Sequence, residues 1–249
     1  MYRVENAGLS GENLWMTGET RRSVCIAIDG PAGAGKSTVA REVAKTLGYT
    51  YIDTGAMYRA LTYAALKAGL DSCDAPAIAS LARSLEITLK PGSNGSVRVL
   101  VDGSDVTREI RSPEVDRMVS PVAAIPEVRT ILVGKQQAMA RAGGMVMEGR
   151  DITTVVLPGA EVKVYLDATA EERARRRARE LRASGYDVSL DDTLEEIRNR
   201  DRIDSQRECS PLTKCEDAIV LDTTGMPVER VIACVVELAR KAQEGQCTT

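Results

Sequence analysis

The stretch "GPAGAGKST", residues 30–38, decides the fold of this 249-residue chain. It follows "SVCIAID", residues 23–29, a short run rich in apolar and β-branched residues that is typical of a buried strand. After it, "STVAREVAKTLG", residues 37–48, repeats apolar residues at helical spacing and ends in glycine, which commonly terminates a helix. A strand, a loop with the spacing Gly-x4-Gly-Lys-Ser and a helix together are typical of a phosphate-binding loop, or P-loop. The sequence therefore predicts a P-loop NTPase fold with an ATP or GTP site.

The residue types in this loop each fit a part of a nucleoside triphosphate. Glycines allow backbone N–H groups to converge on phosphate oxygens, Lys36 adds a positive charge at the β- and γ-phosphates, and the Ser37 hydroxyl can ligate Mg²⁺. Asp29, at the end of the preceding strand, either caps the helix or holds a water on the magnesium, and both roles stay open. We expect ATP to contact Gly30, Pro31, Ala32, Gly33, Ala34, Gly35, Lys36, Ser37 and Thr38.

The composition describes a globular protein and excludes several classes. Hydrophobic residues make up 43% of the chain and charged residues 28%, with a net charge of −3 that argues against a nucleic-acid partner. Without a membrane-spanning apolar run or a signal-peptide core, we expect a cytoplasmic protein with no membrane partner. Residues 1–22 show no hydrophobic periodicity and are expected to be a flexible extension.

The chain contains no histidine, and none of its six cysteines forms a Cys-x-x-Cys pair. This excludes a His-based metal site and every Ser-His or Cys-His nucleophilic pair. The chemistry must therefore depend on positioning, cations and carboxylates.

Strands and helices alternate along most of the chain. Together with residues 23–29, the runs "YTYID", "MVME", "EVKVYLD" and "AIVLDTTG" (from residues 49, 145, 161 and 218) predict a five-stranded parallel sheet between two helical layers, a three-layer α/β sandwich. Residues 86–102 alternate in polarity around a Gly/Asn/Ser turn and predict an inserted antiparallel hairpin. Residues 112–144 are expected to be helical in pieces broken at Pro121 and Pro126. Arginine-rich residues 170–185 predict a charged helix, and helices are also expected after residue 54 and over 75–85, 189–208 and 227–243.

Two common P-loop classes lack their signatures here. No Asn-Lys-x-Asp guanine reader follows a later strand, and no strand ends in consecutive acids as in motor or helicase ATPases. Arginines are frequent after the strands instead. Phosphoryl transfer between two nucleotides gathers many negative charges, so these guanidinium groups favour a nucleotide kinase.

Residues 26–61, "IAIDGPAGAGKSTVAREVAKTLGYTYIDTGAMYRAL", and residues 147–180, "MEGRDITTVVLPGAEVKVYLDATAEERARRRARE", resemble the bacterial cytidylate kinases, the CMP/dCMP branch of the nucleoside monophosphate kinases. The resemblance runs from about Ser23 to Gln243 and implies one domain over 23–243, followed by a tail at 244–249. It implies a monophosphate-binding insert at about 54–130, enlarged by the hairpin, and an arginine-rich lid at about 171–190. The implied reaction transfers the γ-phosphoryl group of MgATP to CMP or dCMP.

The resemblance also implies roles for individual residues. Thr54 would place a hydroxyl near the acceptor, Arg59 and Arg111 would lie at the acceptor phosphate, and Ser120 and Arg129 would read the cytosine ring. An arginine suits the acceptor N3 and O2 of cytosine, whereas uracil presents an N3–H donor that arginine cannot accept. The remaining members implied for the acceptor are Arg150, Asp151, Arg200, Asp204 and Arg207.

The arginines of the lid would close over the donor phosphates and exclude water. Arg173 is expected to bind ATP, and the catalytic set is expected to be Lys36, Arg150, Arg176 and Arg177. Taken alone, the arginine-rich run would be a solvated helix face with i,i+4 pairs; beside a P-loop, a lid is favoured. Thr153 departs from the family, which more usually has glycine after this Gly-Arg-Asp loop.

Two alternatives remain. One is a P-loop kinase for another small acceptor of the shikimate or dephospho-coenzyme A type, against which the hairpin and the base-reading residues argue. The other is a regulatory ATPase that hydrolyses ATP without an acceptor. Nothing in the sequence resembles a coiled-coil seam, so we expect a monomer.

Overall fold

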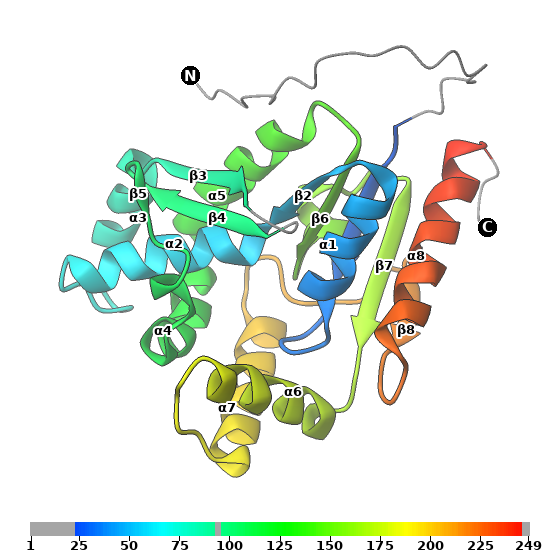
Figure 1. Cartoon of the computed structure of the whole chain (residues 1–249). Coiled ribbons are helices and arrows are strands. Elements are labelled where there is room, and N and C mark those ends of the chain that lie inside the picture. The colour runs from blue at the N-terminus through cyan, green and yellow to red at the C-terminus, as the bar shows by residue number, and fades with distance from the viewer. Residues whose placement is uncertain (1–22, 93–95, 246–249) are drawn as a thin grey trace.

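The computed structural model describes residues 23–92 and 96–245, and its centre is a five-stranded parallel sheet (Figure 1). The strand order is β2-β6-β1-β7-β8, so the strand that enters the P-loop lies in the middle. This confirms the predicted sheet. The strands are β1 (Cys25–Asp29), β2 (Thr50–Asp53), β6 (Met145–Gly149), β7 (Val162–Asp167) and β8 (Ile219–Asp222).

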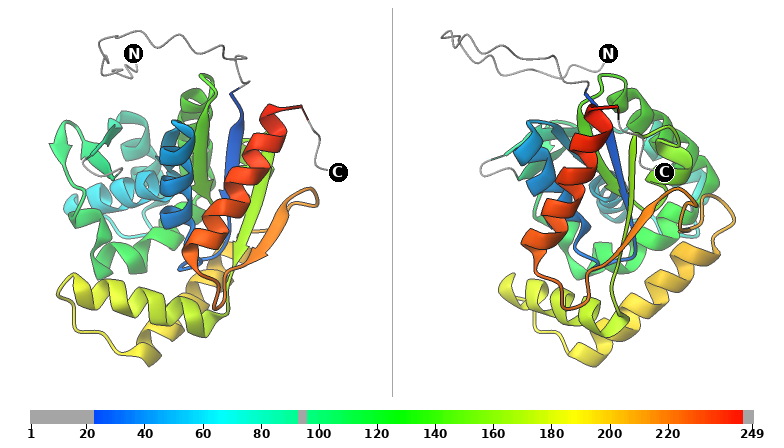
Figure 2. Two further views of the ribbon diagram at one scale, coloured as in Figure 1. Left: turned by 45° about the vertical axis from the view of Figure 1, so that its right-hand side comes forward. Right: turned by 90° about the vertical axis from the view of Figure 1, so that its right-hand side faces the viewer.

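Helices cover both faces of this sheet, which gives the predicted three layers (Figure 2). Successive side chains of β1 alternate between the faces: Ile26 and Ile28 pack toward α1 and α8, and Ala27 packs on the opposite face. The helices are α1 (Lys36–Leu47), α2 (Thr54–Lys67), α3 (Ala75–Ser84), α4 (Pro113–Ala124), α5 (Pro126–Ala140), α6 (Ala170–Ala183), α7 (Leu190–Gln206) and α8 (Val228–Gln243). Within the described ranges, none of these helices is long and apolar enough to span a membrane.

One predicted helix break is wrong. Pro121 lies inside α4, which continues to Ala124. A proline in a helix removes one backbone hydrogen bond, but Val119 and Val122 on either side are buried in the adjoining core and hold the turn together. The predicted break at Pro126 is confirmed, because Ile125 before it is extended and separates α4 from α5.

The insert between β2 and β6 is built around its own hydrophobic core, formed by α2 to α5 and a small sheet. Strands β3 (Ile87–Pro91) and β4 (Val97–Val101) pair antiparallel, as predicted, and a two-residue strand that was not predicted, β5 (Ser104–Asp105), pairs with β4. The predicted turn of the hairpin falls partly on residues 93–95, which lie outside the described residues.

Two helices extend past the carboxyl end of the sheet, where the P-loop also lies (Figure 1). Helix α6 begins after Thr169, whose hydroxyl accepts a hydrogen bond from the N–H of Glu172 as an N-cap. Helix α7 packs on α6 and on α4 of the insert. The N-terminal extension and the last four residues of the predicted tail lie outside the described residues.

Candidate active site

The P-loop connects β1 to α1, and its shape depends on glycine. At Gly30 the backbone has φ +147°, and a Cβ atom would lie 2.0 Å from the carbonyl oxygen of Leu166. Gly33 and Gly35 also have positive φ, at +76° and +90°, and Gly35 is the N-cap of α1. Side chains rarely adopt this backbone, so the loop requires glycine for its tight turns. Its end at the N-terminus of a helix is a favourable place for phosphate.

Lys36 lies folded over this loop. Its Nζ donates to the carbonyl oxygen of Pro31 at 2.8 Å, and the residue is only 6% exposed. Burial, followed by the positive charge of Arg150, lowers the pKa of Lys36, while Glu148 and Asp29 act in the opposite direction. A phosphate at the loop would supply the negative charge that this buried ammonium group favours.

Glu148 is a site residue that the sequence analysis missed. It is 3% exposed near the end of β6, next to β1, and its Oε1 accepts a hydrogen bond from the hydroxyl of Tyr51. Burial, reinforced by the charge of Asp53, raises the pKa of Glu148, whereas the charge of Lys36 and side-chain hydrogen bonds with Tyr51 and Ser37 oppose this rise. The available signal was a single acid near the end of a strand, which is weaker than the consecutive acids typical of motor and helicase ATPases. Mg²⁺ prefers oxygen ligands such as hydroxyl and carboxylate groups, so the side chains of Ser37 and Glu148 fit a magnesium site.

Asp29 does not cap the helix that follows the P-loop, because α1 has no side-chain cap. The buried carboxylate instead accepts from the N–H of Ile152 at 2.9 Å and from the N–H and hydroxyl of Thr153 at 2.8 and 2.7 Å. These bonds fix the start of η3 (Ile152–Val156), a short π-helical turn directly after Arg150 and Asp151. Thr153 therefore adds a hydroxyl contact that a glycine could not make.

A pocket beside the P-loop gathers the residues expected to bind the acceptor, with one exception. Its lining contains Thr54, Arg59, Ser120, Arg129, Arg150, Asp151, Arg200, Asp204 and Arg207, together with Gly55, Tyr58, Val119, Ala123 and Gly149, which were not predicted. The exception is Arg111, which is 51% exposed and lies 3.6 Å from Asp53 outside this lining. The cavity measures about 60 Å³, far below the roughly 300–1,000 Å³ of typical ligand pockets. Side chains must therefore separate to admit a nucleotide.

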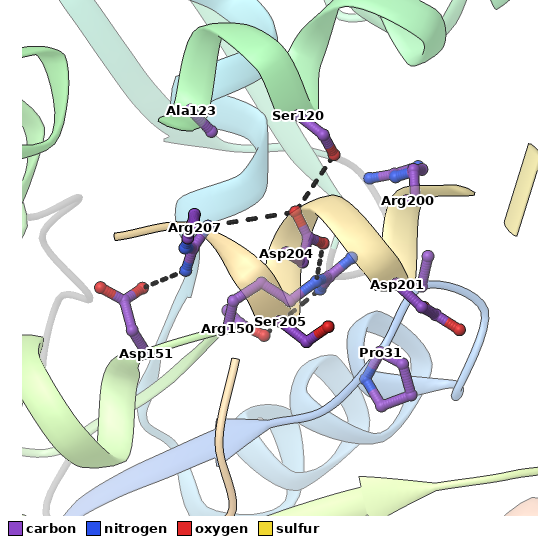
Figure 3. Close-up of polar contacts among 12 residues, drawn as sticks. Pro31, Ser120, Ala123, Arg150, Asp151, Arg200, Asp201, Asp204, Ser205 and Arg207 are labelled. Atoms are coloured by element: carbon purple, nitrogen blue, oxygen red, sulfur yellow. Dashed lines mark hydrogen bonds and ion pairs between the residues drawn. The ribbon is translucent and has the colours of Figure 1, made fainter. Parts of the chain in front are cut away.

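Asp204 lies at the centre of this pocket (Figure 3). Its Oδ1 accepts from the Ser120 hydroxyl at 3.1 Å, and its Oδ2 accepts from Nε of Arg150 at 3.0 Å. Arg207 lies at the edge of ion-pair distance, 4.0 Å from Oδ1. Burial alone would raise the pKa of Asp204, but Arg150, Arg200 and Arg207 outweigh it and hold the pKa below its usual value. The carboxylate is therefore charged at neutral pH.

Arg129 forms the second polar centre of the pocket. Its Nη2 pairs with Asp151, its Nη1 donates to the carbonyl oxygen of Ala123 at 3.0 Å, and the guanidinium lies 5.4 Å from the ring centre of Tyr58. Among the residues that the structure describes, Nε of Arg129, Nε of Arg200 and Nη2 of Arg207 are buried without a hydrogen-bond acceptor. Buried donors of this kind are available to a ligand.

The three arginines that were expected to form part of a lid differ in their surroundings. Arg173 is buried, donates to the carbonyl oxygens of Ala168 and Ala32 at 2.9 and 3.1 Å, and pairs with Asp201. Binding of Arg173 to a donor phosphate would require these bonds to break.

Arg176 and Arg177 lie further along α6. Arg176 donates to Thr223 and to Glu172, and its Nη1 lies 3.7 Å from the position that a Cβ of Gly35 would take, beside the P-loop. Arg177 pairs with Asp116 of the insert and with Glu180.

A P-loop beside a pocket rich in arginine and carboxylate defines the chain as a P-loop kinase. The family model described as "Cytidylate kinase" matches residues 26–241. The curated cytidylate kinase of Pelotomaculum thermopropionicum is 55% identical over 211 residues, which cover 85% of this chain and 93% of that protein. That of Geobacillus kaustophilus is 53% identical over 89% of this chain and 98% of its own length. An uncharacterized protein of Eubacterium ventriosum has a similar fold, with a TM-score of 0.50 at 10% identity over 88% of this chain and 99% of its own.

The chain belongs to the cytidylate kinase family and is accordingly a nucleoside monophosphate kinase. This confirms the family that the motifs of residues 26–61 and 147–180 resembled.

Proposed function

We propose that the protein transfers the γ-phosphoryl group of MgATP to CMP or dCMP, giving ADP and CDP or dCDP. The observation that carries this proposal is the pocket in which Ser120, Arg129 and Asp204 converge beside the P-loop. The pocket combines charged donors and acceptors for a base with arginines for a phosphate. Family membership supports the same reaction.

Base recognition is assigned to Arg129, Ser120 and Asp204. Nε of Arg129 is a buried donor suited to the acceptor atoms of cytosine, and the Asp204 carboxylate can accept from the cytosine amino group or a sugar hydroxyl. Uracil has a carbonyl where cytosine has its amino group and an N–H at N3. UMP would therefore leave buried donors and acceptors unpaired, which lowers its affinity.

The acceptor phosphate is assigned to Arg59, Arg150 and Arg200, which line the pocket together. Thr54 and Arg207 support the same region. Asp151 acts through Arg129, with which it pairs. Arg111, at an exposed position outside the lining, joins the phosphate only if the insert moves.

The donor phosphates are assigned to the P-loop from Gly30 to Thr38. Lys36 and Arg176 are assigned the role of stabilising charge on the transferred phosphoryl group, because both lie at the loop. Arg177, one residue after Arg176 on α6, is assigned the same role. The acceptor phosphate oxygen is already anionic, so the chain needs to position it in line and requires no proton base. Arg173 braces the P-loop through the carbonyl of Ala32.

Mg²⁺ is assigned to the Ser37 hydroxyl and, directly or through water, to Glu148. When bound, Mg²⁺ neutralises phosphate charge during transfer. Asp29 holds a magnesium-bound water only if one of its oxygens accepts an additional hydrogen bond, since both already contact the start of η3.

An ADP-release assay with MgATP against CMP, dCMP, UMP, AMP, shikimate and no acceptor tests the proposal. We expect CMP and dCMP to be the preferred acceptors, and Arg129→Ala and Asp204→Asn to lower kcat/KM for CMP on the order of 100-fold or more, as loss of a buried recognition pair does. Preference for another acceptor, or equal ATP consumption without one, would contradict it.

The assay needs a control in which an equally charged but remote pair is broken. Asp217→Asn serves this purpose, because Asp217 is exposed, pairs with Lys163 at 2.6 Å and does not line the pocket. Its activity should match that of the wild type.

We also propose that the protein is a monomer in solution, since the pocket is formed within one chain. Light scattering during size-exclusion chromatography should give a mass near 26.8 kDa, and twice that value would contradict the proposal.

A further inference from the structure

Asp116 is a buried carboxylate that contacts three arginines from three different elements. On α4, its Oδ1 accepts from Nη2 of Arg59 (α2) at 2.5 Å and lies 3.3 Å from Nη1 of Arg200 (α7). Its Oδ2 pairs with Nη2 of Arg177 (α6). The Asp116 side chain is 9% exposed, so the three contacts enclose it. No motif in the sequence marked this residue.

Asp116 lies outside the pocket lining and contacts two arginines that belong to it. Arg59 and Arg200 line the acceptor pocket, whereas Asp116 is not part of the lining. Arg200 presents a buried Nε without a hydrogen-bond acceptor among the described residues. The carboxylate therefore holds two pocket arginines from one side and leaves other donors of their guanidinium groups for a ligand.

The charges explain why such a carboxylate is needed. Burial, followed by the neighbouring charge of Arg59, lowers the pKa of Arg200 to about 10. The guanidinium groups of Arg59 and Arg200 therefore repel each other, and water screens them little. Burial would raise the pKa of Asp116, but Arg59, Arg200 and Arg177 lower it to about 2, so it is ionised at neutral pH. Three guanidinium groups and one carboxylate leave a local charge of +2, which suits a phosphate monoester dianion.

The third contact connects this cluster to the lid. Arg177 lies one residue after Arg176, whose guanidinium is next to the P-loop, and its ion pair with Asp116 crosses from α6 to α4 of the insert. The side-chain carboxylate of Asp116 thus touches both the arginines of the acceptor pocket and a helix that approaches the donor site.

We propose that Asp116 is a positioning residue that holds Arg59 and Arg200 in the acceptor pocket and, through Arg177, couples the acceptor pocket to α6. The inference rests on the assignment of Arg59 and Arg200 to the acceptor phosphate made above. Asp116 itself contacts no reacting atom. Asp116 couples the binding of the acceptor to the position of Arg177, because the same carboxylate contacts Arg177 and the pocket arginines.

A double-mutant cycle tests this coupling. CMP affinity is measured by calorimetry without ATP, and kcat and KM are measured with MgATP, for wild type, Asp116→Asn, Arg177→Gln and the double variant. We expect Asp116→Asn to weaken CMP binding and to lower kcat, each on the order of 10-fold. Arg177→Gln should weaken CMP binding about 5-fold in the wild-type background and have little effect after Asp116→Asn, because the two act through one contact.

Equal effects of Arg177→Gln in both backgrounds would overturn the proposal, as would CMP binding and kcat within twofold of wild type in Asp116→Asn. If Asp116→Asn does not fold, the Arg177→Gln variant alone tests the proposal. Weaker CMP binding by this variant in the absence of ATP supports the coupling, and unchanged CMP binding overturns it. Asp105→Asn is the matched control, since Asp105 pairs with Arg98 at 2.8 Å on an exposed strand of the same insert. Its CMP affinity and kcat should equal those of wild type.

Failure of the underlying assignment is recognised separately. Arg59→Ala and Arg200→Ala should each raise the KM for CMP if these residues bind the acceptor phosphate. If both variants bind CMP normally, the assignment is wrong. If both weaken CMP binding while Asp116→Asn does not, the assignment stands and only the role of Asp116 is overturned.

Discussion

At the scale of single residues, the Asp116 carboxylate should give the protein a measurable acid sensitivity. Its pKa in the folded protein is about 2, against roughly 3.9 in an unfolded chain. Between pH 2 and roughly pH 4 the unfolded state therefore binds more protons than the folded state, so the free energy of unfolding rises with pH in this range. The contribution of the Asp116 charge is fully present above about pH 5. The shift corresponds to roughly 2–3 kcal/mol of the free energy of unfolding.

The corresponding variant is Asp116→Asn, studied by urea unfolding between pH 7 and the lowest pH at which the fold persists. At pH 7 we expect the free energy of unfolding of the variant to be about 2 kcal/mol lower than that of the wild type. This difference should shrink as the pH falls from 4 toward 2. A difference that is the same at every pH would mean that the charge of Asp116 does not contribute.

Thr153 offers a second prediction for a single residue. Its hydroxyl donates to Asp29 at 2.7 Å in a buried place. Replacing it by valine keeps the shape and removes the donor, which should lower the free energy of unfolding by about 1 kcal/mol. Thr153→Ser retains the hydroxyl and should lose less. Equal stability of the valine variant and wild type in chemical denaturation would show that this hydrogen bond contributes nothing net.

The sequence predicted most pocket residues and missed the residues that position them. Ser120, Arg129 and Asp204 stand in motifs that resemble those of a known family, so the resemblance implied that they share one pocket, and all three line it. Asp116 and Glu148 could not be predicted, because their roles depend on partners far away in the chain. The partners of Asp116 lie at residues 59, 177 and 200, and a single sequence contains no information about such pairings.

At the scale of elements, the contact between the P-loop and β7 should tolerate no side chain. A Cβ on Gly30 would lie 2.0 Å from the carbonyl oxygen of Leu166, whereas a Cβ on Gly48, at the C-terminus of α1, has no atom within 4 Å. Both glycines have positive φ. We expect Gly48→Ala to lower stability by about 1 kcal/mol from backbone strain alone, and Gly30→Ala to prevent folding or to displace the loop.

Thermal unfolding and ADP release measured for the two variants distinguish these effects. Gly48→Ala should retain kcat near the wild-type value, because Gly48 is remote from the pocket lining. A Gly30→Ala protein with normal stability and activity would show that the loop and β7 can separate at little cost.

Most elements could be predicted from hydrophobic periodicity, and the errors have local causes. Pro121 should end a helix by its own geometry, but burial of its neighbours in the insert core outweighs one lost hydrogen bond. Strand β5 is only two residues long, too short to produce an alternating pattern. Tertiary packing decides both cases.

At the scale of the whole molecule, the acceptor should stabilise the fold by bringing the insert, the sheet and α7 together. A ligand that binds only the folded state at 100 times its Kd adds about 2.7 kcal/mol, which for a chain of this size raises Tm by roughly 5–10 °C. We expect this shift with CMP and a much smaller one with UMP at the same concentration. Equal shifts would indicate that the pocket does not read the base.

The five-stranded parallel sheet and the three layers follow from the alternating pattern and were predicted, whereas the strand order β2-β6-β1-β7-β8 was not. The contracted cavity of about 60 Å³ could not be predicted, since it arises from side chains that pair across the pocket. Arg150 with Asp204 and Arg129 with Asp151 fill this space, and charge complementarity between them is fixed only when the elements meet.

The contacts of Arg173 have a mechanical consequence. Its guanidinium ties the first turns of α6 to Ala32 in the P-loop and to Asp201 in α7, and its Cβ lies 3.0 Å from the place where a side chain on Gly33 would begin. The first turns of the arginine-rich helix are therefore anchored to the P-loop, and Arg177 farther along joins the same helix to the insert through Asp116. A displacement of the insert that pulls on Arg177 would be passed along one continuous helix to the residue that contacts the P-loop.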